Sequence, residues 1–387
     1  MESACVRWSS PRRVPMVSSG ASRADGGREA EPQPPRRERS VVPSNTFSSK
    51  RALDDQRWPA LSRGTYPIRP EAFPAVGGSE GVAEIVAVGD AVTTVESVVP
   101  HVASDGRRHF HAAAPGMRVT PAHPGAGTWR QYAVLPAASC RALPLALPVV
   151  EAAQLLVNPP TALRMLSDFV PLVAGRDTVA LNAAASAVGR AALQMCRRRG
   201  VDTVAFLRPR DDPETYAADA GELYRLGASL VLPDDGCAHR SPEARAAMQK
   251  LPPVSLALNG VGGASSATLA SLLREKGVMV TYGGMAKQPA RVPTGALIFK
   301  DIVARGFWLT RWLADEKKAA AEAGGGGGGD DAALTSSPKM REMAEELCDM
   351  VMDGALRMPA REVTLEECLT AMSSPAEIGG RKLLIRF

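Results

Sequence analysis

The sequence predicts an α/β protein that joins a doubly wound parallel sheet to a separate β-rich domain. Strands and helices alternate over residues 177–233, which is the signature of a parallel sheet. A strand-like apolar run bounded by Gly81 and Gly89 stands well before that segment. The length of 387 residues exceeds one ordinary domain, and the hydrophobic share of 45% is close to that of globular proteins. We therefore expect two folded domains, each able to bury a core.

The parallel sheet is predicted element by element. Three strands are expected at 177–182, 202–207 and 230–232, with helices at 186–199 and 214–226 between them. Gly227 stands where the second helix should end. Two further strands, 254–259 and 278–282, flank a helix at 265–276. This rhythm is typical of a nucleotide-binding sheet with helices on both faces.

The flanking segments differ in character. Residues 1–40 are rich in Arg, Ser, Pro and Gly without an apolar period, so we expect disorder there. Their basic, acid-poor start is similar to an organelle transit peptide. A low-complexity Gly-rich loop is expected at 319–337, followed by an amphipathic helix at 339–353. Met340, Met343 and Met350 recur on one side of that helix and should lie in the core.

Composition argues against several classes of function. The net charge of +5 is modest and concentrated near the N-terminus, which argues against a nucleic-acid surface. Pro144, Pro148 and Glu151 interrupt the most apolar stretch, so no segment should insert into a membrane. The six cysteines form no CxxC pair, so neither a disulfide framework nor a thiolate zinc site is expected.

The turn after the first strand of the parallel sheet has the composition of a dinucleotide site. It reads NAAASAVG over 182–189, where small residues allow a pyrophosphate to approach the helix N-terminus. The second strand ends at Leu207, followed by Arg208 and Arg210, where an NADP site places arginine on the 2′-phosphate. The alternative is that both arginines are merely solvated. The residues favour NADPH over NAD.

Several stretches resemble the mitochondrial trans-2-enoyl-CoA reductases of the medium-chain dehydrogenase/reductase superfamily. The similarity covers about 64–387 and is carried by PAVGGSEGVAEIVAVG (74–89), GAGTWRQYAVLP (125–136), VNPPTALRMLSDF (157–169), LALNGVGG (256–263), VTYGGMAKQP (280–289) and LIFKDIVARGFWLTRW (297–312). Within the superfamily, YGGMAKQP and the RGFWL run are typical of these reductases.

The resemblance implies a GroES-like catalytic domain, a Rossmann domain and reduction of 2-enoyl thioesters by NADPH. It divides the chain into a GroES-like part at 41–154, a Rossmann domain at 155–308 and a return to the catalytic domain at 309–387. The catalytic tyrosine falls on Tyr66, whose protonated phenol could serve as an acid. The implied cofactor contacts are Asn158, Ala185, Ser186, Ala187, Val188, Arg208, Pro209, Arg210, Tyr282, Gly283, Gly284, Met285, Phe307, Trp308, Leu309 and Arg381.

The resemblance also sets further expectations. It implies a homodimer in the mitochondrial matrix that accepts acyl groups carried by CoA or by acyl carrier protein. No metal is expected, because Gly78-Ser79-Glu80 stands where zinc-containing relatives have Gly-His-Glu. The usual strands at the start of the catalytic domain have no counterpart in residues 1–40, which predicts an incomplete domain, and Ala185 and Ala187 replace family residues. The alternatives are a quinone oxidoreductase and a non-catalytic, nucleotide-binding regulatory descendant.

Overall fold

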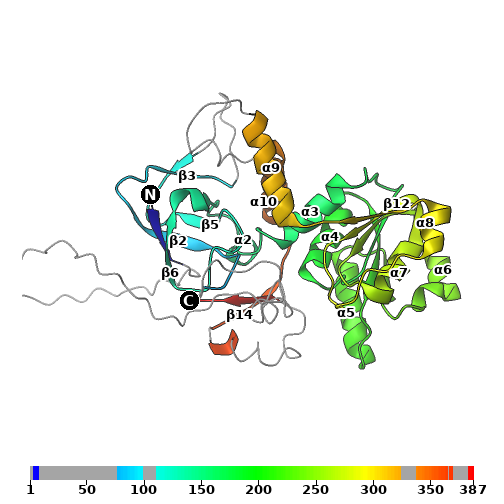
Figure 1. Cartoon of the computed structure of the whole chain (residues 1–387). Coiled ribbons are helices and arrows are strands. Elements are labelled where there is room, and N and C mark those ends of the chain that lie inside the picture. The colour runs from blue at the N-terminus through cyan, green and yellow to red at the C-terminus, as the bar shows by residue number, and fades with distance from the viewer. Residues whose placement is uncertain (1–2, 8–75, 99–109, 324–336, 365, 369–381) are drawn as a thin grey trace, which may run out of the picture.

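The computed structural model describes residues 3–7, 76–98, 110–323, 337–364, 366–368 and 382–387 (Figure 1). Tyr66 and Arg381, the predicted catalytic and C-terminal cofactor residues, lie outside the described residues. Residues 8–40 of the segment predicted to be disordered, and residues 324–336 of the Gly-rich loop, also lie outside them. The prediction of a loop is wrong for residues 319–323, which are the last part of a helix.

A parallel sheet in the order β10-β9-β8-β11-β12-β13 forms one of the two domains. Its strands are β8 (Thr178–Leu181), β9 (Asp202–Leu207), β10 (Leu230–Pro233), β11 (Val254–Asn259), β12 (Leu273–Thr281) and β13 (Val303–Gly306). Numbered along the chain within the sheet, this order is 3-2-1-4-5-6, the Rossmann arrangement. The predicted doubly wound sheet is confirmed.

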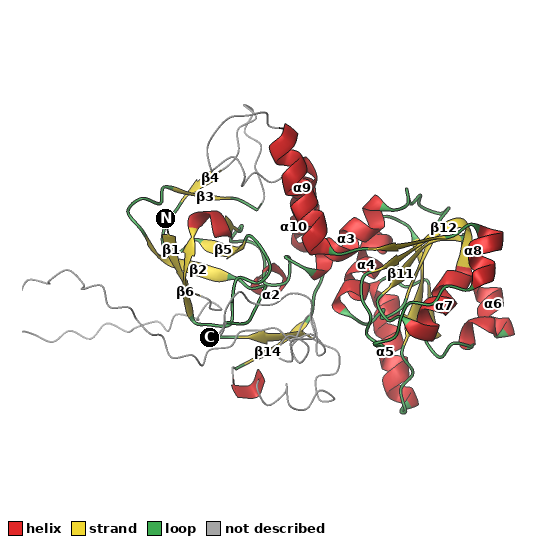
Figure 2. Ribbon diagram, viewed as in Figure 1, coloured by secondary structure: helices red, strands yellow, loops and turns green. Residues whose placement is uncertain are grey.

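Helices cover both faces of this sheet (Figure 2). Alternate strand residues point to opposite faces, so Val179 and Leu181 join one buried core while Ala180 joins the other. The first core packs against α3 (Asn158–Asp168), α4 (Ala187–Arg198), α5 (Pro213–Leu226) and α10 (Pro338–Met352). The second packs against α6 (Pro242–Met248), α7 (Gly263–Leu272) and α8 (Thr294–Lys300).

The sequence predicts the end of one helix of this domain correctly and the end of another incorrectly. Gly227 ends α5 in the left-handed conformation with φ 117°, as predicted. The helix predicted at 265–276 is too long, because α7 ends at Leu272 and β12 begins at the next residue. Leu273 pairs with Val254, and the register then shifts before Val278 pairs with Leu256. The extra residues bulge out of the strand, so sheet pairing overrides the local helical pattern.

An antiparallel sheet in the order β6-β1-β2-β5-β7 forms the other domain. Its strands are β1 (Ser3–Arg7), β2 (Ala83–Val88), β5 (Arg118–Pro121), β6 (Tyr132–Pro136) and β7 (Cys140–Ala142). Ile85, Val119 and Ala133 bury their side chains in its core. A separate antiparallel pair consists of β3 (Thr94–Glu96) and β4 (Phe110–Ala112). A 3-10 turn (Ala137–Ser139) and α2 (Val149–Ala152) complete the domain.

The prediction of disorder over residues 1–40 is wrong for Ser3–Arg7. This strand pairs with β2 on one side and with β6 on the other. Both neighbouring strands thereby gain backbone hydrogen-bond partners along this edge, with a register shift between Cys5 and Val6 where β1 meets β2. The sequence showed no apolar period here, because a five-residue strand paired on both sides depends mainly on its neighbours.

The chain returns from the parallel sheet through α9 (Leu309–Ala323) and α10, which lie between the two domains (Figure 1). Met343 and Met350 of α10 are buried, as predicted for this helix. The C-terminal residues form β15 (Lys382–Ile385), which pairs in parallel with β14 (Ala360–Val363). Among the described residues, every helix is too short or too polar to cross a bilayer.

Candidate active site

The turn after β8 presents the N-terminus of α4 at the carboxyl edge of the parallel sheet. Ser186 is the N-cap of α4, and its Oγ accepts a hydrogen bond from the Gly189 N–H at 3.2 Å. A Cβ on Gly189 would lie 2.5 Å from the Ala184 carbonyl oxygen, so only glycine lets the helix pack this close. Unoccupied N–H groups at such a helix start attract a phosphate.

The alanines of this turn are not equally strained. Ala183 has φ of 50°, the left-handed region that favours glycine. Ala185 and Ala187, which replace family residues, are absent from the positive-φ positions of the described chain. Both are half-buried, whereas Val188 is buried against the core. In this turn, the backbone cost of a side chain at positive φ therefore falls on Ala183 and not on Ala185 or Ala187.

Two buried asparagines hold the strand ends together. Asn182 Nδ2 donates to Asn259 Oδ1 and to Ser265 Oγ, each at 2.9 Å, and the Gly260 N–H donates to Asn182 Oδ1 at 2.7 Å. Asn259 in turn donates to Thr281 Oγ1 at 3.1 Å. This network crosses the point where the strand order reverses, which is where ligands bind in such sheets. The sequence signal for this network is an asparagine at the end of each of two predicted strands, Asn182 and Asn259.

Tyr282 contacts the same turn from the end of β12. Its hydroxyl hydrogen-bonds to Ser186, while burial raises the pKa of the phenol to about 12 against the opposing effect of that bond. A Cβ on Gly260 would lie 2.7 Å from the Tyr282 hydroxyl, so the ring lies directly over that glycine. Gly283 is half-buried, and Gly284 and Met285 are exposed beyond it. Two parts of the predicted cofactor site are thus brought together.

The arginines at the end of β9 differ in their contacts. Arg208 and Pro209 are exposed, whereas Arg210 is half-buried. Arg210 Nε and Nη2 donate to Asp219 Oδ2 of α5 at 2.9 and 2.8 Å. The sequence motif predicts one role for both arginines and does not indicate Asp219, which follows Arg210 by nine positions.

The remaining predicted contacts lie where α3 and α9 begin. Asn158 starts α3 and is 3% exposed, and its Nδ2 has no hydrogen-bond partner among the described residues. The Phe307 N–H donates to the Thr281 carbonyl at 2.9 Å, which places Phe307 beside the end of β12. Leu309 is buried, while Trp308 is 44% exposed. None of these observations connects Asn158 directly to the turn.

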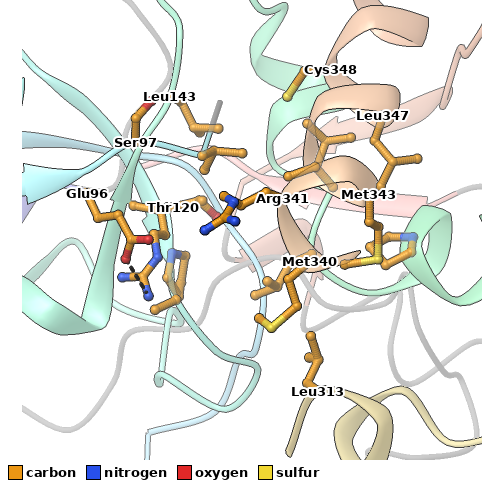
Figure 3. Close-up of a pocket in the computed structure, with 18 residues that line it drawn as sticks. Glu96, Ser97, Thr120, Leu143, Leu313, Met340, Arg341, Met343, Leu347 and Cys348 are labelled. Carbon is orange, nitrogen blue, oxygen red and sulfur yellow. Dashed lines mark ion pairs between the residues drawn. The ribbon is translucent and has the colours of Figure 1, made fainter. Parts of the chain in front are cut away.

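An apolar cavity of about 120 Å³ lies between the two domains (Figure 3). Thr120 and Leu143 line its strand side, and Met340, Met343 and Leu347 of α10 line the other. Leu155, Leu156 and Pro160 close it beside the start of α3. Arg341 and the Glu96–Arg141 ion pair, 3.0 Å long, are its charged members. Such a cavity suits an elongated apolar group with few polar atoms.

Glu80 of the Gly78-Ser79-Glu80 segment forms a buried ion pair. Lys382 Nζ lies 3.2 Å from Glu80 Oε2, and the two side chains are 5% and 3% exposed. Within the described residues, no cluster of His, Cys, Asp or Glu could hold a metal ion.

The residues present fit a dinucleotide. The turn offers a helix N-terminus, Asn158 keeps an orphaned buried donor, and Arg208 supplies an exposed cation. Fold and site together define a Rossmann-type oxidoreductase with a GroES-like second domain.

No family model matches the chain. It is 40% identical over 295 residues to the mitochondrial enoyl-[acyl-carrier-protein] reductase of Caenorhabditis elegans, covering 76% of this chain and 72% of that protein.

Solved structures agree with this relationship. A complex of Etr1p with NADP and crotonyl-CoA superimposes with a TM-score of 0.68 at 26% identity, over 90% of this chain and 93% of the other. The mitochondrial 2-enoyl thioester reductase Etr1p/Etr2p heterodimer from Candida tropicalis gives the same TM-score and identity, over 91% and 93%. The chain belongs to the mitochondrial enoyl-[acyl-carrier-protein] reductase family. The predicted resemblance is confirmed, in preference to the quinone oxidoreductase alternative.

Proposed function

We propose that this protein uses NADPH to reduce trans-2-enoyl thioesters to saturated acyl thioesters, as a step of mitochondrial fatty acid synthesis. The observation that carries the proposal is the pairing of two features at one sheet edge. These are the Ser186 turn, which suits a pyrophosphate, and an exposed arginine at the end of the neighbouring strand, which suits a 2′-phosphate. Membership of the enoyl reductase family supplies the substrate class.

When bound, NADPH supplies a hydride to the β-carbon of the enoyl group. The protein's own residues hold the cofactor and deliver the matching proton. As the C=C bond is reduced, its electron pair moves toward the thioester carbonyl, and the resulting enolate takes a proton at the α-carbon. We assign that proton to the Tyr66 phenol, which is protonated at neutral pH in its reference state. Water then returns a proton to the phenolate.

The cavity between the domains is the proposed site of the acyl chain. Its walls are largely apolar, and Leu155, Leu156 and Pro160 flank Asn158 along the chain. The buried, unpartnered Asn158 Nδ2 is then available for a polar group of substrate or cofactor. The carrier is CoA or acyl carrier protein, and the place of action is the mitochondrial matrix.

We propose further that the protein is a homodimer joined at β13. This strand is at the edge of the parallel sheet, and all four of its residues are exposed. Phe299 and Ile298 of the adjacent α8 are 83% and 66% exposed. An unpaired edge beside large apolar side chains suits a second copy of the same strand. Light scattering should give twice the chain mass, and Phe299→Glu should give monomers.

The activity is tested by following NADPH oxidation with a trans-2-enoyl-CoA and, separately, with a small quinone. We expect turnover of the thioester, and faster turnover of the quinone would contradict the proposal. Tyr66→Phe should lower kcat by about a hundredfold or more while leaving NADPH affinity unchanged. Unchanged turnover would remove Tyr66 from the mechanism. A folded protein that shows no thermal shift with NADPH would instead support the non-catalytic alternative.

A further inference from the structure

We propose that Asp219 weakens the hold of this protein on the 2′-phosphate by engaging Arg210, so that Arg208 alone selects NADPH over NADH. The inference rests on the proposed use of NADPH. It assigns different roles to two arginines that the sequence places in one motif, and it adds an acidic residue as a determinant of cofactor specificity.

The first observation is the engagement of Arg210. Its Nε and Nη2 both donate to Asp219 Oδ2, at 2.9 and 2.8 Å. The side chains of this pair are 28% and 24% exposed, so water screens the interaction only in part. Because a charge-assisted contact of this kind uses two of the five guanidinium donors, an incoming phosphate must displace it or accept fewer bonds.

The second observation is the freedom of Arg208. It is exposed directly after β9, and among the described residues it makes no ion pair and no side-chain hydrogen bond. Its guanidinium can therefore turn toward a ligand without losing a partner. β9 pairs with β8, whose end leads into the Ser186 turn, so Arg208 follows the strand next to the proposed pyrophosphate site.

The third observation is the acidic surroundings. Asp212 is already committed as the N-cap of α5, because its carboxylate accepts the N–H groups of Glu214 and Thr215. Asp219 lies further along the same helix and pairs only with Arg210 among the described residues. Near a phosphate dianion, that carboxylate acts in two ways: it neutralises Arg210, and it repels the ligand.

The consequence is an asymmetric site. Among the residues that the structure describes, Arg208 is the only uncommitted cation at the end of β9, so its removal takes that charge away. Removing Arg210 takes away a cation that Asp219 already neutralises. Removing Asp219 releases Arg210 and abolishes the repulsion, so the affinity for a 2′-phosphate should rise. Binding of NADH, which has no such phosphate, should respond to none of these changes.

The test measures dissociation constants of the full chain for NADPH, NADH and the probe 2′-AMP, by calorimetry without acyl substrate. Arg208→Ala should raise the dissociation constants for NADPH and 2′-AMP by about tenfold to a hundredfold. Arg210→Ala should raise them by less than about threefold. Asp219→Ala should tighten both ligands by about threefold to tenfold. Glu214→Ala, which removes an exposed charge from the same helix without contacting Arg210, is the matched control.

Two results would overturn the inference. One is an equal loss of NADPH affinity in Arg208→Ala and Arg210→Ala. The other is an Asp219→Ala variant that binds NADPH no more tightly than Glu214→Ala. Failure of the proposed function looks different, because the wild-type chain would then bind NADPH but leave it unoxidised when a trans-2-enoyl-CoA is added.

Discussion

Asn182 donates a side-chain hydrogen bond to Asn259 Oδ1 at 2.9 Å, which joins the ends of β8 and β11 where the strand order reverses. Its own Oδ1 accepts the Gly260 N–H at 2.7 Å. The asparagine therefore fixes the floor of the proposed cofactor site from inside the protein. Asn158, also buried, has an amide nitrogen without a partner among the described residues.

These two asparagines should respond differently to replacement by alanine. Asn182→Ala leaves the buried Gly260 N–H without its side-chain acceptor and removes the donor to Asn259 and Ser265, which should lower the free energy of unfolding by about 3 kcal/mol. Asn158→Ala removes an unsatisfied donor and should change stability by less than about 1 kcal/mol while lowering activity. Urea denaturation and turnover measured on both variants test this contrast. Equal loss of stability would contradict it.

Gly189 should tolerate no side chain. The Cβ of Gly189→Ala would lie 2.5 Å from the Ala184 carbonyl oxygen, which is backbone and cannot move aside cheaply. We expect the free energy of unfolding to fall by about 3 kcal/mol and NADPH to bind more weakly, because α4 must shift away from the turn. Gly221→Ala is the control, since that glycine lies within α5 and faces open space. It should stabilise the protein by about 0.5–1 kcal/mol, and similar effects of the two substitutions would refute the steric argument.

The different predictability of these features has a physical basis. β9 and β11 occur at the predicted residues, because an apolar run of strand length is a local signal. The end of α7 and the strand Ser3–Arg7 were missed, since both depend on pairing with distant strands. At the site, the structure has the 182–189 turn between β8 and α4 and the two arginines after β9, as the sequence predicts, while their role in binding a cofactor stays a prediction. The Asn182 network and the partner of Arg210 were not found, because they depend on side-chain geometry. Tyr66 remains a prediction.

The buried pair of Glu80 and Lys382 should contribute strongly to stability. It joins the catalytic domain to β15 near the C-terminus, with the nitrogen 3.2 Å from the carboxylate oxygen. Lys382→Met leaves the buried Glu80 carboxylate without this partner, and we expect the free energy of unfolding to fall by about 3–5 kcal/mol. Lys318→Met breaks the exposed pair with Glu322 and should cost less than about 0.5 kcal/mol. Comparable denaturation midpoints for the two variants would contradict this assignment.

His123 should make stability depend on pH. Burial, and then the charges of Lys317 and Arg141, lower its pKa to about 4, while a hydrogen bond with the Ala122 backbone opposes them. Lys317 Nζ lies 2.8 Å from His123 Nε2. Because the pKa of His123 in the folded state lies below the reference of 6.5, the stability that depends on its neutral imidazole is fully present above pH 6.5. That stability is lost as the pH falls toward 4.

His123→Gln should therefore flatten the dependence of the melting temperature on pH between about 6.5 and 4. His111→Gln provides the control, because His111 is exposed on β4. Thermal scans across this pH range would decide the matter. If His123→Gln and the wild type lose stability in parallel on acidification, His123 is not the group responsible.

The strand Ser3–Arg7 should be required for the catalytic domain to fold. Cys5 pairs with Ala87 of β2 and with Val134 of β6, so it lies within a central strand. Cys5→Pro removes a backbone donor and fixes φ, which should cost about 3 kcal/mol or more and expose strand edges that promote aggregation. Cys5→Val keeps the donor and favours a strand, so it should fold and bind NADPH as the wild type does. Melting temperature and light scattering compare the two variants. A stable, monodisperse Cys5→Pro protein would show that β2 and β6 do not depend on this segment.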